Sequence, residues 1–587
     1  MAKVRMSNLC TRNTFNYMQK LLFLPETSFS LNRNCLSRVK AGILLLFVVV
    51  QQPVFSQKIN KYWVEFSDKN NSPYCSCRPA EFLSARALER RARASIEVVE
   101  NDLPVNPGYL KQLKTSGVQI HNTSRWLNAA AIMADSSAAV KIGKLPFVKS
   151  VHYLGPHLKY RNPPNRPVKK RAPLKSDPAI QGADIPIWGY ATQQNQLLGI
   201  PVLHSAGHRG EGIWVAVMDG GFTNADTIPM FDSVALKGRL FPGWDFVERD
   251  AGIFEGAQHG TSVLSVMAAN LPGYFVGTAP DASYFLLKTE DTGGEYPIEE
   301  ANWVAGAEWA DSIGVNIINA SLGYTSFNDN TLSHQYSDLD GRTAIGSRGA
   351  AIAASKGMIV CNSAGNEGDG TWRYIGVPAD APGLIAVGAV DSEGQRAGFS
   401  SFGPTPDGRI KPDLMAPGDQ VIVAGNVGIA LGISSGTSLA SPMLVGAMAS
   451  LWSAFPEKTA EEILDAVFAS ADQAAKPNNE RGYGLPDMTQ AWLELSDMVI
   501  GNGGIFEFDR ALDEFVFTHG SNSFKPGDSI ELRNILGQRI EGIVSEIFPK
   551  EVSSLKISGL ENLPSGHYQI ILNNKIEGKR MGFAVWK

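Results

Sequence analysis

The chain has 587 residues, 44% of them hydrophobic, and a formal net charge of −5. A single hydrophobic core stops growing at about 250–300 residues, so this length predicts several domains. The mildly acidic composition argues against a protein that binds nucleic acid through a basic surface.

The first predicted element is an apolar run at residues 43–50, which follows Arg38 and Lys40 and precedes residues 54–56. A basic flank, a short apolar stretch and modest-sized residues after it are typical of a signal peptide. We therefore expect residues 1–56 to be a removable leader and the protein to be secreted or held at the cell surface. The run is too short to be a membrane span.

Residues 57–154 alternate between strand and helix patterns, which predicts a small α+β unit. The expected strands are 62–66, 126–131 and 147–151, and the expected helices are 79–93 and 136–145. A Pro- and Lys-rich stretch at 163–175 is typical of an exposed linker.

The charge run from Glu89 to Arg93 has two interpretations. It could be a basic processing site, but such runs on helices usually form a solvated face, and we favour that interpretation.

Residues 186–498 contain three places where a polar side chain lies at the end of a predicted strand or at the start of a predicted helix. The apolar run 212–218 ends at Asp219, His259 opens an apolar helix, and the strand 358–361 runs into Asn366. Continuous apolar runs predict parallel strands buried on both faces. Proteins of the α/β class place their sites at the carboxyl edge of such a sheet.

Ser438 lies in the most informative stretch, a small-residue turn followed by an apolar helical pattern. A helix start offers unpaired N–H groups and the positive end of the helix dipole, and both favour negative charge beside the hydroxyl. Pro442 is expected in the first helical turn, where its missing N–H costs little. The structural alternative for such a serine is a helix cap.

Other histidines and cysteines of this region receive structural interpretations. We expect His204 and His208 on the surface of an amphipathic helix and His334 in a polar loop. Cys361 is the one cysteine beyond residue 185, and we expect it to pack in the core. The other four cysteines lie in the predicted leader (Cys10, Cys35) and in the α+β unit (Cys75, Cys77).

Toward the C-terminus, Thr459 and Glu462 form a capping-box pattern that opens a helix at 460–471. After the glycine-rich residues 501–504, the apolar period becomes alternating. Short strands at 530–533, 555–557 and 568–570 predict a small β-sandwich over 505–587.

The polar residues Asp219, His259, Asn366 and Ser438 follow one another in this order, and the sequences around them resemble the subtilases, the subtilisin-like serine peptidases. The resemblance extends from roughly Ile187 to Leu495. Three further blocks carry the same resemblance: Gly277–Pro280, Asn316–Gly323 and Gly482–Asp487. The resemblance implies an α/β catalytic domain of three layers with a mostly parallel sheet. It also implies a secreted serine endopeptidase that is made as a self-processing zymogen.

The resemblance assigns roles to the four polar residues. Ser438 would be the nucleophile, His259 the general base and Asp219 the group that orients the imidazole. Asn366 would bind the oxyanion. Each residue alone is more often structural, but the four together favour catalysis.

Two segments would form walls of the pocket for the substrate residue before the cut. They are Ser321, Leu322 and Gly323, and Ser363, Ala364 and Gly365. They contain no acidic residue, which favours apolar or broad selectivity. Three positions depart from the usual pattern: Gly220, Ser262 and Leu439.

The flanking regions also carry resemblances. Residues 57–154 would be a propeptide, acting as intramolecular chaperone and inhibitor, with processing within 155–185. Residues 536–539 and 564–568 resemble motifs of the C-terminal sorting domain of the type IX secretion system. The alternative for 505–587 is a stabilising or substrate-binding domain.

The expected partners are protein or peptide substrates, the chain's own propeptide and secretion machinery. The chemistry requires no cofactor, and a structural calcium is expected by resemblance without assignable ligands. The alternative function is a catalytically silent subtilase-fold binding or adhesion protein, and a lesser alternative is an esterase. The presence of all four catalytic-type residues argues against the silent protein.

Overall fold

The computed structural model describes residues 58–157 and 187–496, and seven strands between residues 504 and 586. The predicted leader (1–56) and nearly all of the predicted processing region (155–185) lie outside the described residues, and the predicted domain boundaries stay predictions. Within the described part, no helix is both long enough and apolar enough to cross a membrane.

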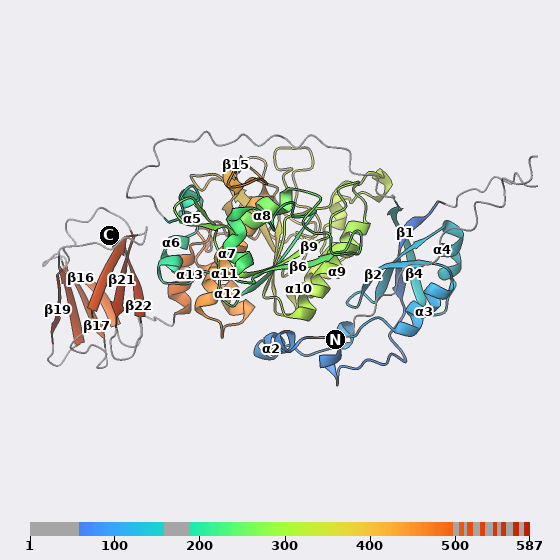
Figure 1. The fold of residues 1–587 in the computed structure, drawn as a ribbon, viewed down its shortest axis with the longest axis horizontal. Coiled ribbons are helices and arrows are strands. Elements are labelled where there is room, and N and C mark those ends of the chain that lie inside the picture. Colours follow the sequence, from blue (N-terminus) through green and yellow to red (C-terminus); the bar gives the residue numbers. More distant parts are fainter. Residues whose placement is uncertain are drawn as a thin grey trace, which may run out of the picture. The chain divides into compact units, whose positions relative to one another are not determined.

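The N-terminal unit is an antiparallel sheet of four strands in the order β2-β3-β1-β4 (Figure 1). The strands are β1 (Asn60–Phe66), β2 (Gln119–Ser124), β3 (Ala129–Ala134) and β4 (Val148–Pro156). Strand β1 is buried along its whole length. Its Tyr62 and Val64 pack in the core of this unit, whereas Trp63 packs in the core shared with the large sheet.

Two differences from the sequence prediction are local. The strand expected at 126–131 is β3 at Ala129–Ala134, because Trp126 and Leu127 are buried in a turn that Asn128 completes with a φ of 48°. Asn tolerates this left-handed conformation. The sequence analysis also missed strand β2 and helix α3 (Pro107–Thr115), whereas the expected last helix is present as α4 (Ser136–Ile142).

The helix expected at 79–93 is broken into a short 3-10 turn, η1 (Pro79–Glu81), and helix α2 (Ala85–Arg93). Ser84 caps α2 by accepting a hydrogen bond from the Ala87 N–H at 3.1 Å. A second 3-10 turn, η2 (Glu100–Asp102), follows. Cys75 and Cys77 form a disulfide just before this segment.

The central sheet has seven strands, and every neighbouring pair is parallel. In spatial order they are β13 (Leu414–Pro417), β12 (Ile385–Val390), β11 (Ile359–Ser363), β10 (Ile317–Ala320), β5 (Trp214–Asp219), β9 (Ser283–Lys288) and β6 (Leu240–Asp245). The predicted mostly parallel sheet is confirmed.

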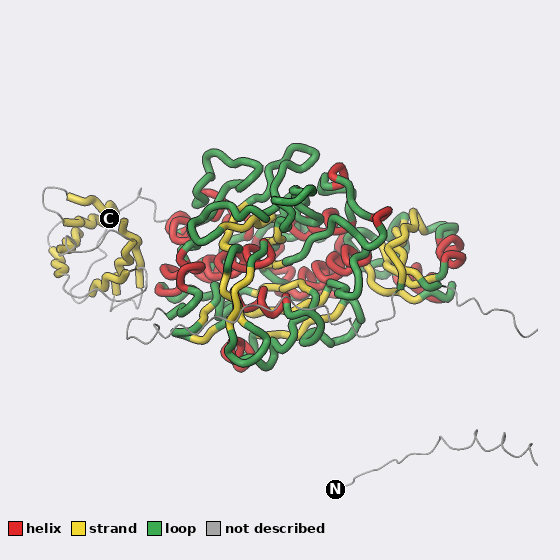
Figure 2. Tube along the Cα trace, turned by 90° about the horizontal axis from the view of Figure 1, so that it is seen from above, coloured by secondary structure: helices red, strands yellow, loops and turns green. Residues whose placement is uncertain are grey.

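Helices cover both faces of this sheet (Figures 1 and 2). Alternate residues of β5 face opposite sides, so Val215 and Val217 pack with α8 (His259–Ala268) and α11 (Thr437–Ala454). Ala216 and Met218 pack with α9 (Ile298–Ile313) and α10 (Ile345–Ala354). The domain therefore has three layers, with a separate apolar core on each face.

Shorter elements complete this domain. They are α5 (Thr192–Gln196), α6 (Ile200–Ser205), η3 (Pro229–Phe231), α7 (Asp232–Leu236), β7 (Asn270–Leu271), β8 (Phe275–Val276), η4 (Asn330–Leu332), η5 (Tyr336–Asp338), β14 (Val421–Ala424), β15 (Leu431–Ser434), α12 (Ala460–Ala469) and α13 (Met488–Leu495). The predicted capping box is present, since Glu462 N–H donates to Thr459 Oγ1 at 3.2 Å and Thr459 N–H donates to Glu462 Oε2 at 2.8 Å.

The strands after residue 504 form two antiparallel sheets, ordered β16-β17-β20-β19 and β18-β21-β22. Their bounds are β16 (Gly504–Asp509), β17 (Glu514–His519), β18 (Ser529–Asn534), β19 (Val544–Phe548), β20 (Ser553–Ser558), β21 (His567–Asn573) and β22 (Arg580–Trp586). They include the three predicted strands, while the β-sandwich itself stays a prediction.

The structure contradicts the prediction for His204 and confirms the prediction for Cys361. His204 is buried, not exposed, because Trp188 Nε1 donates to its Nδ1 at 2.9 Å and its Nε2 lies 3.1 Å from the Thr278 carbonyl oxygen. Cys361 is buried in β11 as expected, and this burial raises the pKa of its thiol.

Candidate active site

Asp219 is the last residue of β5, at the carboxyl edge of the central sheet. Its side chain is 1% exposed, and its Oδ2 lies 2.8 Å from His259 Nδ1. Its Oδ1 accepts a hydrogen bond from the Gly220 N–H at 2.8 Å. The carboxylate is therefore held in place on both oxygens.

His259 is the first residue of α8, and its side chain is 43% exposed. The helix can begin this close to the aspartate turn because residue 260 is glycine. An added Cβ on Gly260 would lie 2.4 Å from the Gly221 carbonyl oxygen. The imidazole thus contacts a buried carboxylate through Nδ1 and is partly exposed.

Ser438 is the second residue of α11 and is partly buried. Pro442 is the sixth residue of this helix, so the prediction that it lies in the first turn is wrong. Without an N–H, Pro442 gives no helical hydrogen bond to the carbonyl group four residues earlier, which is that of Ser438. Ser321 Oγ donates to this carbonyl oxygen instead, at 2.8 Å.

A short hydrogen-bond chain continues from Ser321 and ties β10 to α11. Asn319 Nδ2 donates to Ser321 Oγ at 3.1 Å, and Ser441 Oγ donates to Asn319 Oδ1 at 2.8 Å. All three side chains are buried. Our sequence analysis gave Asn319 and Ser441 no role of their own, although both lie inside the motifs that it used.

Asn366 lies just beyond β11 and is exposed. Its Oδ1 accepts hydrogen bonds from the N–H and the hydroxyl of Thr437, at 2.8 and 3.0 Å. These two bonds fix the amide and leave its Nδ2 as the donor end. Thr437, which precedes Ser438, is a further positioning residue that the sequence analysis did not single out.

The two predicted substrate-binding segments lie against each other. The Leu322 carbonyl oxygen accepts hydrogen bonds from Asn362 Nδ2 at 2.7 Å and from Ser363 Oγ at 3.2 Å. Ala364 is fully buried, and Gly365 N–H donates to Thr437 Oγ1 at 3.1 Å. Gly323 is exposed, and an added Cβ on it would meet only the Val377 carbonyl oxygen within 4 Å, at 3.9 Å.

The structure shows the surroundings of the three departures from the usual pattern. An added Cβ on Gly220 would lie 3.1 Å from Thr292 Cγ2, so neighbouring side chains already fill the space there. Ser262 and Leu439 are both buried, in α8 and α11 respectively.

Three carboxyl groups lie together near this edge: Glu290, Glu295 and Glu299. They do not make a convincing calcium site, because Glu299 already accepts the backbone N–H groups of Asp291 and Tyr296 and Glu290 accepts the hydroxyl of Tyr324. Calcium prefers several carboxylate and carbonyl oxygens that are free to coordinate it. We assign them no metal, and the calcium prediction stays without ligands.

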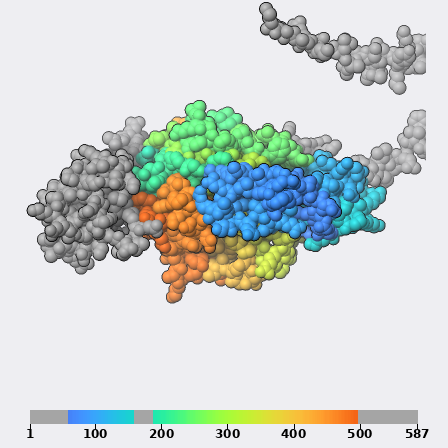
Figure 3. All heavy atoms as spheres, turned by 90° about the horizontal axis from the view of Figure 1, so that it is seen from below, coloured from blue at the N-terminus to red at the C-terminus, as the bar shows by residue number. Residues whose placement is uncertain are grey.

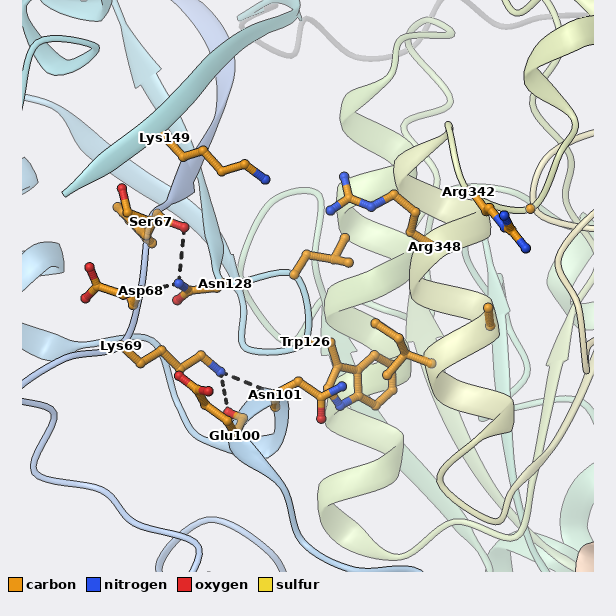
Figure 4. Close-up of a pocket in the computed structure, with 15 residues that line it drawn as sticks. Ser67, Asp68, Lys69, Glu100, Asn101, Trp126, Asn128, Lys149, Arg342 and Arg348 are labelled. Carbon is orange, nitrogen blue, oxygen red and sulfur yellow. Dashed lines mark hydrogen bonds between the residues drawn. The ribbon is translucent and has the colours of Figure 1, made fainter.

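A cavity of about 700 Å³ opens away from these residues, between the N-terminal sheet and helix α10 (Figure 4). Its lining includes Lys69, Lys149 and Arg348. Lys69 is held by carbonyl oxygens of residues 100, 101, 103 and 125 at 2.7–3.4 Å. None of the predicted site residues lines this cavity.

Comparison with known proteins gives matches over both the site and the N-terminal unit. The Subtilase family matches residues 210–485, and the Peptidase S8 propeptide domain of Bacteroidota matches residues 61–171. Subtilisin NAT of Bacillus subtilis subsp. natto is 33% identical over 307 residues, which cover 51% of this chain and 72% of the relative. Subtilisin of Bacillus pumilus is 34% identical over 275 residues, which cover 46% and 88% respectively.

A solved structure of the MycP3 protease from the type VII (ESX-3) secretion system is also similar. It is 24% identical, and the match covers 52% of this chain and 88% of that one with a TM-score of 0.42. A likeness at this level carries no argument about function.

Proposed function

The chain belongs to the subtilase family and is a serine-type endopeptidase with a propeptide domain, and from this premise we propose that Asp219, His259 and Ser438 form its catalytic triad. The observation that carries the proposal is the 2.8 Å contact between the buried Asp219 carboxylate and His259 Nδ1. It fixes the proton on Nδ1 and leaves Nε2 to act as the base.

In the proposed reaction, Ser438 Oγ attacks the scissile carbonyl carbon while His259 Nε2 takes the hydroxyl proton. The imidazolium then gives this proton to the leaving amine, so the peptide C–N bond breaks and an acyl-enzyme remains. Water then attacks the acyl carbon while His259 Nε2 takes one of its protons. His259 gives this proton to Ser438 Oγ as the ester C–O bond breaks, and the acyl group leaves as a carboxylic acid. Asp219 stays ionised and stabilises the imidazolium throughout.

Negative charge develops on the carbonyl oxygen in each step. We assign Asn366 Nδ2 and the Ser438 N–H as its donors, because Thr437 orients the amide and Ser438 lies at the start of α11. Neither donor requires a cofactor.

The substrate is proposed to be an extended polypeptide. Residues 321–323 and 363–365 lie side by side next to Ser438 and supply backbone groups and small side chains. Selectivity for the residue before the cut is expected to be apolar or broad. A peptide library that shows strong preference for Arg or Lys would contradict this part.

We further propose that the N-terminal unit inhibits the enzyme until the chain cleaves itself within residues 155–185. The described end of β4 already reaches the edge of the sheet where the site lies, since an added Cβ on Gly155 would lie 2.8 Å from Tyr296 Cδ1, just before α9. This position of the end of β4 supports the proposal.

Export is a separate proposal. It rests on the leader pattern in residues 1–56 and on the sorting-domain motifs at 536–539 and 564–568. Deletion of residues 505–587 should strand active enzyme inside the cell envelope if the domain sorts the protein. It should change substrate binding if the domain is a binding module.

The triad proposal is tested with residues 57–587 expressed as wild type, Ser438→Ala and Ser435→Ala. Ser435 is the matched control, because it is exposed and its hydroxyl donates to Asp419 at 2.7 Å. We expect wild type and Ser435→Ala to shed the propeptide and degrade casein, and Ser438→Ala to stay intact with casein hydrolysis lower by about 10⁴ or more. A folded Ser438→Ala protein that keeps its activity would contradict the proposal.

A further inference from the structure

Glu290 lies in the connection between β9 and α9, beside the catalytic edge of the sheet. Part of the residue is exposed, but its carboxyl group is enclosed, and burial is the main reason that the pKa of this carboxyl rises to about 8. Asp219, Asp291 and Glu295 add to the effect because their charges oppose its ionisation. At neutral pH, Glu290 is therefore an uncharged carboxylic acid.

On one side, Glu290 holds the substrate-binding segment. Tyr324 directly follows residues 321–323, is 1% exposed, and donates its hydroxyl to Glu290 Oε1 at 2.5 Å. The backbone of Tyr324 is also fixed, since it exchanges two hydrogen bonds with Val377 at 2.8 and 3.1 Å. The hydroxyl bond is thus the side-chain link between this segment and the β9–α9 connection.

On the other side, Glu290 packs against the turn that follows the catalytic aspartate. An added Cβ on Gly220 would lie 3.5 Å from the Cβ of Glu290. The Gly220 N–H is the donor that holds Asp219 Oδ1. Glu290 therefore lies beside the turn that holds Asp219, and it accepts a hydrogen bond from the residue that follows one wall of the substrate pocket.

The charged surroundings explain why the neutral form suits this position. Glu299, at the start of α9, is a second buried carboxyl, and burial together with the charges of Glu290 and Glu295 raises its pKa. Lys61 of β1 lies 4.0 Å from the neighbouring Asp291. An ionised Glu290 would add a negative charge to a cluster of carboxyl groups.

We propose that Glu290 is a positioning residue, which links the β9–α9 connection beside the Asp219–Gly220 turn to the substrate-binding segment through Tyr324. The inference rests on the proposed function, because it concerns how the same active site binds its substrate. Loss of the link should loosen the wall that precedes Tyr324 and weaken substrate binding, while the triad itself stays assembled.

The test compares Glu290→Gln, Glu290→Leu and Tyr324→Phe with wild type, all prepared from residues 57–587. Glutamine accepts the tyrosine hydroxyl and donates as a protonated acid does, whereas leucine has neither group. On an extended peptide substrate at pH 7, we expect Glu290→Leu and Tyr324→Phe each to raise KM roughly five- to tenfold, with kcat changed less than about twofold. Combining the two should add little, because both remove the same hydrogen bond.

Two readouts separate positioning from a general structural role. At pH 7, the KM of Glu290→Gln should lie close to the wild-type value and well below that of Glu290→Leu. Between pH 7 and 9.5, the wild-type KM should rise as Glu290 ionises, whereas the KM of Glu290→Gln should stay level. Glu393→Gln, which changes an exposed carboxylate, should follow wild type throughout.

The proposal is overturned if Glu290→Gln and wild type share one pH profile, if Glu290→Leu lowers kcat at constant KM, or if the two single effects add in full. None of these results would disturb the dependence of the activity on Ser438. Failure of the triad proposal would show instead as activity in Ser438→Ala.

Discussion

Two groups of buried carboxylates in this molecule face opposite surroundings. Asp311, near the end of α9, is fully buried and receives three arginines of the N-terminal unit: Arg90 at 2.5 Å, Arg91 at 2.8 Å and Arg125 at 2.6 Å. Glu290, before the start of the same helix, faces a tyrosine hydroxyl and other carboxyl groups. The arginines around Asp311 favour a charged carboxylate, whereas the surroundings of Glu290 favour a neutral carboxylic acid.

The difference separates two tasks of the molecule. Asp311 fastens the propeptide to the catalytic domain, and Asp102 extends this cluster through Arg91 and Lys356 at 3.1 and 3.0 Å. Burial opposes ionisation of Asp102, but the Val99 N–H and the two cations outweigh it and lower its pKa. The space-filling view shows the segment that carries Arg90 and Arg91, in blue, against later parts of the chain (Figure 3).

The arginine cluster also lies away from the active site. In a strand–helix–strand unit with parallel strands, the helix runs back across the sheet, so the end of α9 lies at the edge opposite its start. Arg86 of α2 confirms this placement, because it donates to the carbonyl oxygens of Gly212 and Gly314, on the side where β5 begins. The propeptide therefore contacts α9 near both ends, at Tyr296 and at Asp311.

The largest effect is expected from Asp311→Ala in the uncleaved Ser438→Ala protein. The substitution leaves three buried arginines without their shared partner, and breaking a buried ion pair from one side typically costs about 3–5 kcal/mol. Hydrogen exchange should show lost protection in residues 58–157, with the central sheet much less affected. Glu89→Ala is the control, because the Glu89 side chain is 70% exposed. Equal protection in Asp311→Ala and the control would contradict the claim that Asp311 holds the propeptide on the catalytic domain.

The next largest effect is expected from Glu290→Gln, which should stabilise the protein where Asp311→Ala destabilises it. Below pH 4.5, Glu290 is protonated in both the folded and the unfolded chain, so its ionisation does not affect stability. From pH 4.5 to about 8, the unfolded chain releases a proton that the folded chain retains, and stability falls as pH rises. Glutamine has no such proton to release.

We therefore expect Glu290→Gln to match wild type at pH 4 and to be more stable at pH 8, by on the order of a few kcal/mol. Thermal unfolding of the Ser438→Ala protein across this pH range measures it. A variant that is less stable than its parent at pH 8 would show that Glu290 is ionised and paired, as Asp311 is.

Both clusters show what the sequence could predict and what it could not. Strands β5, β10 and β11 and the starts of α8 and α11 were predictable, because each is a local apolar run beside a polar turn. The candidate site residues came from motifs at those same turns. The roles of these residues stay predictions, although the structure places Asp219 against His259 and Ser321 against Ser438.

Two of the wrong interpretations depend on partners that are distant in the chain. The charge run at Glu89 to Arg93 was interpreted as a solvated face. Arg90 and Arg91 are instead buried, because they pair with Asp311, which lies 220 or more residues later in the chain. His204 was placed on the surface, but Trp188 and the Thr278 carbonyl group enclose it. Local patterns do not contain such pairings.

The smallest effect is expected at the exposed end of the same interface. Lys149 lies 3.3 Å from Glu65 and is 65% exposed, whereas Arg348 of α10 contacts the same carboxylate at 2.8 Å. Figure 4 shows the side chains of Lys149 and Arg348. Solvent screens such a pair, so Lys149→Ala should change the unfolding free energy of the Ser438→Ala protein by less than about 0.5 kcal/mol. Hydrogen exchange of residues 58–157 should match the parent protein. A loss comparable with that of Asp311→Ala would mean that the number of charges across the interface, and not their burial, holds the propeptide in place.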